Sequence, residues 1–152
     1  MTIKCRTKMA IVPVLILCLM VILVSSAWAE YVNKAVTNRD DAVYWLDLGG
    51  LYATYGNYSA AVEAYQKALT LDANNSKAYY DMSVARAELG QMDQALAEIN
   101  RAIALAPDRD RYYYGRAWLL LRMGRSPEAM DNFRKAAEMG NLDAKAYLNL
   151  KR

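Results

Sequence analysis

The stretch WLDLGGLYATYGNYSAAVEAYQKALTLDA, residues 45–73, determines how this 152-residue chain is built. Its pattern of large and small residues returns twice, each time thirty-four positions further along the sequence. The recurring small positions are Gly56, Gly90 and Gly124, then Ala61, Ala95 and Ala129, and then Ala68, Ala102 and Ala136. The recurring large positions are Trp45, Tyr79 and Tyr113, and Tyr65, Ile99 and Phe133. A fixed period of this length, with two helical patterns per unit, is typical of stacked helix–turn–helix units.

These positions, together with the pattern W-x2-L-G-x2-Y that begins at Trp45, resemble the tetratricopeptide repeat (TPR) family. The resemblance covers roughly two thirds of the chain and implies three repeats, at residues 42–75, 76–109 and 110–143. The fold class that it implies is all-α: a superhelix of three helix–turn–helix repeats. A further helix at residues 143–152 would cap the last exposed face, as repeat arrays require.

Turn and capping residues predict where the helices begin and end. The expected helices run from just after Asn38 to about residue 55, and then over residues 59–71, 77–89, 93–105, 110–123, 126–139 and 143–151. Asn38, Asp93 and Ser126 are the expected N-caps, because their side chains can accept from free backbone N–H groups. A glycine between the two helices of each repeat would supply the backbone freedom that the turn needs.

The first 29 residues have the order of a secretory signal peptide. A basic segment with Lys4, Arg6 and Lys8 precedes an apolar run at residues 9–24, and small residues end in an A-x-A pattern at Ala29. Cleavage there would make the protein periplasmic or secreted, with residues 30–41 as a short polar leader. The alternative is an uncleaved anchor in the inner membrane, since residues 9–29 are just long enough to span a bilayer.

The charge balance after residue 29 gives no support for nucleic-acid binding. Residues 30–152 carry sixteen basic and sixteen acidic side chains, so the segment is neutral although the whole chain carries +3. The two halves differ, with −5 over residues 30–108 and +5 over residues 109–152. Such a polarised domain could steer a charged partner or associate head to tail with a copy of itself.

The residue types needed for catalysis are largely missing. The chain has no histidine, and both of its cysteines, Cys5 and Cys18, lie within the first 29 residues. This removes the commonest general base, the thiol nucleophile and most transition-metal ligands from residues 30–152. No G-x-G-x-x-G or Gly-Lys-Ser phosphate loop occurs either. We therefore expect no enzyme activity, no metal, no cofactor and no small-molecule substrate.

The resemblance points to protein binding instead. In similar repeat proteins the first helix of each unit lines a concave groove through its second, fifth, ninth, twelfth and thirteenth positions. In the first unit these positions are Val43, Leu46, Gly50, Ala53 and Thr54. In the second they are Lys77, Tyr80, Val84, Ala87 and Glu88, and in the third Arg111, Tyr114, Trp118, Leu121 and Arg122. The lysines and asparagines with which some family members grip chaperone tails are not matched.

Three aromatic residues are the main candidates for partner contact: Tyr80, Tyr114 and Trp118. They are not needed to complete the repeat pattern, and exposed aromatics beside arginine are typical of interface anchors. The alternative is that Trp118 packs under the terminal helix while the tyrosines shield their neighbours.

Two arginines occupy positions that should face the core. Arg86 stands where the other repeats have Tyr52 and Leu120, and Arg116 stands where they have Leu48 and Met82. Buried arginines must pair with polar groups, so we expect structural roles for both. For Arg86 a ligand-facing role is the alternative.

The sequence therefore predicts an exported TPR adaptor that binds a peptide or helix of another protein in its groove and supports assembly of an envelope complex. The alternative is a self-associating or membrane-tethered scaffold.

Overall fold

The computed structural model describes residues 41–150, in which the chain forms seven helices and no strand. The helices are α2 (Ala42–Thr54), α3 (Tyr58–Leu71), α4 (Ser76–Glu88), α5 (Met92–Leu105), α6 (Asp110–Arg122), α7 (Ser126–Glu138) and α8 (Leu142–Leu150). The signal peptide or anchor expected at residues 1–29, and nearly all of the expected leader, lie outside the described residues. All three expected repeats and the additional final helix are confirmed.

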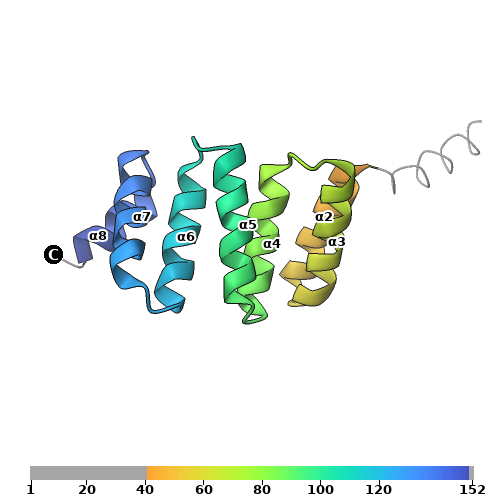
Figure 1. The fold of residues 1–152 in the computed structure, drawn as a ribbon, viewed down its shortest axis with the longest axis horizontal. Coiled ribbons are helices and arrows are strands. Elements are labelled where there is room, and N and C mark those ends of the chain that lie inside the picture. Colours follow the sequence, from red (N-terminus) through yellow and green to blue (C-terminus); the bar gives the residue numbers. More distant parts are fainter. Residues whose placement is uncertain (1–40, 151–152) are drawn as a thin grey trace, which may run out of the picture. The chain divides into compact units, whose positions relative to one another are not determined.

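The helices pack as three pairs in a row, followed by α8 (Figure 1). The pairs α2 with α3, α4 with α5, and α6 with α7 make the most extensive contacts. The remaining contacts join each pair to the next in sequence, and α8 packs against α7. Because each unit touches only its neighbours, the core is continuous along the row but local in sequence.

The repeated alanines and the column of Tyr65, Ile99 and Phe133 form the core, as the sequence predicts. The column of Trp45, Tyr79 and Tyr113 is only partly buried at its edge, and the repeated turn glycines are exposed. Ile99 and Phe133 are fully buried, and Tyr65 occupies the same place in the first repeat. In the first repeat, Gly49 leaves room for Tyr65. A Cβ atom added at Gly49 would lie 2.5 Å from Cε1 of Tyr65. The first two helices of the array can therefore approach closely only because this position is glycine.

The predicted N-caps were wrong in each case. Helix α2 begins after Asp41, whose Oδ1 atom accepts from the Val43 amide at 2.9 Å, whereas Asn38 lies outside the described residues. Gln91 precedes α5 and Arg125 precedes α7, and neither side chain makes a capping hydrogen bond.

For α5 and α7 the reason is the position of the turn glycine in the repeat. Asn57, Gln91 and Arg125 are equivalent positions, each one residue after a turn glycine with φ near +75°: Gly56 (φ 74°), Gly90 (φ 76°) and Gly124 (φ 75°). The left-handed glycine fixes where the next helix starts, whatever side chain follows it. Asp93 and Ser126 therefore fall inside the first turn of their helices, where Asp93 still interacts favourably with the helix dipole.

The two arginines at core-facing positions have structural partners. Arg86 donates to the side-chain oxygen of Gln94 at 2.7 Å, and its Nε atom lies 3.7 Å from Oε1 of Glu98. Arg116 donates to Asn132 and Asn100, each at 2.8 Å. Both arginines join neighbouring helices, which supports a structural role for each. The Nε atom of Arg86 is nevertheless buried without a hydrogen-bond partner.

Candidate functional site

A groove lies over α4 and α6, the first helices of the second and third repeats. It contains two adjoining cavities, which we call the apolar cavity and the polar cavity. The apolar cavity measures about 200 Å³, and its lining residues are Tyr80, Ser83, Val84, Ala87, Glu88, Ile99, Tyr114, Gly115, Trp118, Leu119 and Arg122. The polar cavity measures about 580 Å³ and lies at the N-terminal ends of the same two helices. Tyr80 lines both cavities.

The structure brings together nine of the ten groove positions expected in the second and third repeats; the tenth, Leu121, lines neither cavity and packs against the core of the third repeat. Seven of the nine line the apolar cavity: Tyr80, Val84, Ala87, Glu88, Tyr114, Trp118 and Arg122. The other two, Lys77 and Arg111, line the polar cavity. No residue of α2 lines either cavity, and Leu46, expected to face the groove, is buried in the core of the first repeat.

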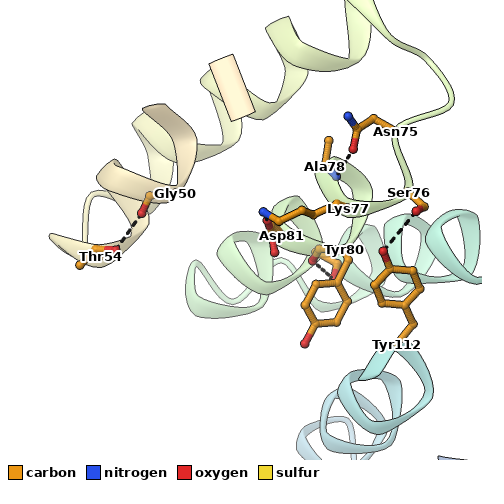
Figure 2. A network of polar contacts seen from close by, with 10 residues as sticks. Gly50, Thr54, Asn75, Ser76, Lys77, Ala78, Tyr80, Asp81 and Tyr112 are labelled. Atoms are coloured by element: carbon orange, nitrogen blue, oxygen red, sulfur yellow. Dashed lines mark hydrogen bonds and ion pairs between the residues drawn. The ribbon is translucent and has the colours of Figure 1, made fainter. Parts of the chain in front are cut away.

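The expectation that Tyr80 is an exposed anchor was wrong. Tyr80 is only 8 % exposed, and its ring stacks on that of Tyr112, with the ring centroids 4.9 Å apart. Figure 2 shows the two rings together, with the hydroxyl of Tyr112 directed at that of Ser76, 3.2 Å away. The ring of Tyr80 also packs against Gly115, where an added Cβ would lie 2.8 Å from Cε2 of Tyr80. Tyr80 therefore forms the floor between the two cavities.

Gly115 is the residue that the sequence-based reasoning missed. Its equivalents in the other repeats are Asp47 and Asp81, so the third repeat has lost a side chain at a position on the α4–α6 contact. The missing side chain admits the ring of Tyr80. A comparison of the three aligned repeats for such a change of size could have identified it.

Trp118 combines the two roles that the sequence left open. Its ring packs edge-on against Phe133 at 5.6 Å and against Tyr147 of α8 at 5.4 Å, measured between ring centroids. It nevertheless remains 42 % exposed. Tyr114 is half-buried and meets Trp118 edge-on at 6.2 Å. The terminal helix thus supports Trp118 from behind while one side of the ring faces the groove.

The far end of the apolar cavity is closed by Arg122 and Glu88, which are equivalent positions in successive repeats. Arg122 donates to Oε1 of Glu88 at 2.8 Å and to the backbone carbonyl of Ala87 at 2.9 Å. A cation at the last carbonyls of α4 is favourable because the C-terminal end of a helix dipole is negative. These two contacts join α4 to α6 at this end of the cavity.

The described residues offer no metal centre, because no three potential ligands among His, Cys, Asp and Glu are grouped within residues 41–150. In the same part of the chain, no helix is both long and apolar enough to cross a bilayer.

Comparison with known proteins gives consistent matches. A tetratricopeptide repeat family model matches residues 38–119, and a second one matches residues 110–139. The TPR repeat-containing protein MJ1428 of Methanocaldococcus jannaschii is 27 % identical over 63 residues. That segment is 41 % of this chain but only 11 % of that relative, so the chain corresponds to a small part of it.

Solved structures share the arrangement of helices. A crystal structure of MamA is 27 % identical with a TM-score of 0.64, covering 73 % of this chain and 64 % of MamA. The TPR domain of Arabidopsis OM64 has a TM-score of 0.67 at 23 % identity, covering 72 % of this chain and 92 % of that domain. The first TPR domain of Spaghetti (RPAP3), solved with an HSP90 peptide, also reaches 0.67, at 22 % identity, with coverages of 72 % and 88 %. Because OM64 and Spaghetti are less than 25 % identical to this chain, their similarity to it concerns the fold alone. The matched family models, the period of thirty-four residues and the paired helices establish that this chain belongs to the tetratricopeptide repeat family.

Proposed function

We propose that this TPR protein is an exported adaptor that holds a peptide segment or helix of another protein in the α4–α6 groove. In this role it supports the assembly of a complex in the cell envelope. The observation that carries the proposal is the apolar cavity of about 200 Å³ between α4 and α6.

The size of the cavity favours a protein ligand over a small molecule. Pockets for drug-sized ligands usually measure about 300–1,000 Å³ and enclose most of the ligand. This cavity is smaller than that range and is open to the groove, so it suits one large side chain that projects from a longer chain. Interfaces commonly concentrate their binding energy on such an anchor, which fills a dry pocket while weaker contacts surround it.

The exposed apolar atoms of the groove support the same conclusion. Val84 is 44 % exposed and Trp118 is 42 % exposed, and both line the apolar cavity. A partner side chain placed between them would remove apolar surface from water, at a gain of about 25 cal/mol for each Å². Arg122 and Glu88 join the two helices at one end of the cavity.

Position-specific cross-linking tests this proposal. A photo-reactive phenylalanine analogue would replace Val84 in the full chain, expressed in the source cells. Leu71, on α3 and outside both cavities, is the matched control because it is 48 % exposed. We expect a discrete cross-linked protein at position 84 and none at position 71. Equal labelling at the two positions, or none at either, would contradict binding in the groove.

Export is a separate part of the proposal and rests on the sequence of residues 1–29. Cleavage after Ala29 removes a fixed mass that intact-mass measurement on purified protein detects directly. An intact N-terminus recovered in the membrane fraction would instead support the inner-membrane anchor.

A second candidate function is self-association into a scaffold. Two exposed leucines, Leu142 (76 %) and Leu150 (86 %), lie on α8, while Leu51 (52 %) and Tyr55 (80 %) are exposed at the opposite end of the row. The opposite net charges of the two halves would favour head-to-tail contact between copies. Light scattering over a range of protein concentrations tests self-association. A molar mass that stays at the monomer value would exclude this candidate function.

A further inference from the structure

Helix α2 exposes the face with which the first helices of the other repeats pack on the repeat before them. Four exposed residues lie along this side of α2, four positions apart, and form what we call the α2 end face: Val43, Asp47, Leu51 and Tyr55. Leu51 is 52 % exposed, whereas the equivalent Ala85 and Leu119 are 1 % and 5 % exposed. Ala85 lies in a core cluster with Tyr65 of the first repeat, and Leu119 lies in one with Ile99 of the second.

Helix α8 carries apolar side chains on two faces. Ala144 is buried, and Tyr147 and Leu148 pack against the core of the third repeat. Three more apolar residues, all exposed and four positions apart, lie along the other side of the helix and form what we call the α8 end face: Leu142, Ala146 and Leu150. A helix that is apolar on opposite sides is typical of one that is covered on both.

The two end faces lie at opposite ends of the row of repeats (Figure 1). The terminal units of a repeat array normally present polar outer surfaces, which keep the array soluble. Both ends of this array instead present apolar side chains, and on each end a single helix supplies them. The face at one end of a copy therefore offers the kind of helical surface that the face at the other end of a second copy lacks.

The charges at the two end faces are complementary. Asp47 lies in the middle of the α2 end face, and Lys145 lies at one edge of the α8 end face. Neither side chain forms an ion pair with another described residue. Asp143 lies at the opposite edge of the α8 end face, in the first turn of the helix, where the helix dipole favours a carboxylate. Lys145 is therefore the charged group of α8 that an acidic residue of another copy can meet.

We propose that copies of this protein associate head to tail, with the α2 end face of one copy packed on the α8 end face of the next. This inference rests on the second candidate function, self-association, and specifies its interface. Side chains spaced four apart on both helices form ridges that can interdigitate, and the small Ala146 permits close approach. Asp47 of one copy meets Lys145 of the other. The contact joins two different surfaces, so it can add copies in a row while every α4–α6 groove stays open.

Disulfide formation tests the polarity of this contact. In a Cys5→Ser/Cys18→Ser background no native cysteine remains, and the full chain is made in two forms, one with Leu51→Cys and one with Ala146→Cys. After mixing and mild oxidation, we expect dimers joined through positions 51 and 146 in excess over dimers of either form alone. Both substitutions in one chain should give a ladder of multimers. The control replaces Leu51→Cys with Leu71→Cys, at an exposed position of α3 outside the α2 end face, and should give neither.

Charge exchange tests the contact between Asp47 and Lys145. Light scattering measures the protein concentration at which half of the chains are associated. Asp47→Lys should raise this concentration by about threefold or more, because it places two like charges together at an exposed contact. Adding Lys145→Asp should restore the parent value. Glu63→Lys, at an exposed position of α3, changes the net charge equally and should have no effect.

The outcomes separate this inference from self-association in general. Dimers joined through two copies of the same position, yields no higher than those of the Leu71→Cys control, or a failure of Lys145→Asp to restore association would overturn the inference. A molar mass that rises with concentration equally in the parent and in Asp47→Lys would place self-association on another surface. A constant monomer mass would overturn both, and the end faces would then be covered by another occupant. None of these results bears on cross-linking at Val84 in the groove.

Discussion

At the residue scale, the groove depends on a glycine in the middle of a helix. An added Cβ at Gly115 would lie 2.8 Å from the ring of Tyr80, which is itself held by its stacking on Tyr112. In Gly115→Ala, displacement of the ring should reduce the affinity for any groove ligand by about tenfold, equivalent to roughly 1.4 kcal/mol. Calorimetric titration with a peptide selected from a random library for binding to the parent protein measures this change.

A second helical glycine gives a matched control for Gly115→Ala. No atom lies within 4 Å of a Cβ built at Gly50, so Gly50→Ala should only gain helix propensity, about 1 kcal/mol. In Gly115→Ala the same gain is opposed by the clash with Tyr80, so its stability to urea should increase by less. Equal stabilisation in the two variants, with unchanged binding, would show that Tyr80 accommodates the methyl group.

Tyr65 predicts how stability depends on alkaline pH. Burial, and in second place the carboxylate of Asp81, raise the pKa of its hydroxyl from 10.0 to about 12. Between these values the unfolded chain has lost the proton that the folded protein keeps. The contribution of Tyr65 to stability is therefore complete below about pH 10 and decreases, as pH rises towards 12, by about 1.4 kcal/mol per pH unit.

Urea unfolding of the parent and of Tyr65→Phe at several pH values between about 9 and 12 tests this linkage. The phenylalanine variant lacks the titrating group, so its stability should decline less steeply. Tyr55→Phe, at a position 80 % exposed, is the control. Parallel curves for the parent and Tyr65→Phe would contradict a raised pKa at Tyr65.

At the scale of the element, the turn inside each repeat depends on backbone conformation alone. Gly90 has φ +76°, and nothing lies within 4 Å of a Cβ built on it. In Gly90→Ala we expect a loss of about 1 kcal/mol, because the left-handed conformation is strained for alanine. Asn tolerates this conformation better, so Gly90→Asn should lose less. Thermal unfolding of both variants measures the difference, and an alanine variant as stable as the asparagine variant would show that the turn rearranges.

At the scale of the whole molecule, stability should propagate along the row of repeats. Each helix pair packs only against its neighbours, and Ile99, 1 % exposed, lies in the core of the middle repeat. Ile99→Ala should cost about 2–5 kcal/mol and weaken the coupling between the outer repeats. Leu51→Ala, at a position 52 % exposed, should change stability by less than about 0.5 kcal/mol.

Two tryptophans can report this loss of coupling. In a Trp28→Phe background, Trp45 reports on the first repeat and Trp118 on the third. Each tryptophan is followed in a variant that keeps only that one, so that its fluorescence reports on a single repeat. The urea transitions of the first and third repeats should coincide in the parent protein and separate in Ile99→Ala. Coincident transitions in Ile99→Ala would mean that the array unfolds as a single cooperative unit despite its local contacts.

The sequence by itself determined the repeats, the helix pairs and their buried positions. Each depends on residues close in the chain or on the fixed period, as the column of Tyr65, Ile99 and Phe133 illustrates. Sequence reasoning also placed nine of its ten second- and third-repeat groove positions along one groove, and Leu121 is the exception. It missed the true N-caps of α5 and α7, because the left-handed turn glycine before each of these helices, not a capping side chain, sets where the helix begins.

Only the tertiary structure decided what each groove residue does. Tyr80 is a buried floor, because Gly115, thirty-five residues later, leaves space for its ring. The ring of Trp118 packs against Tyr147 of α8, and the residue still remains 42 % exposed beside the groove. Exposure, and whether a charge finds a partner, depend on side chains contributed by the neighbouring repeat. The period alone does not specify those side chains, because they occupy positions at which the repeats differ from one another.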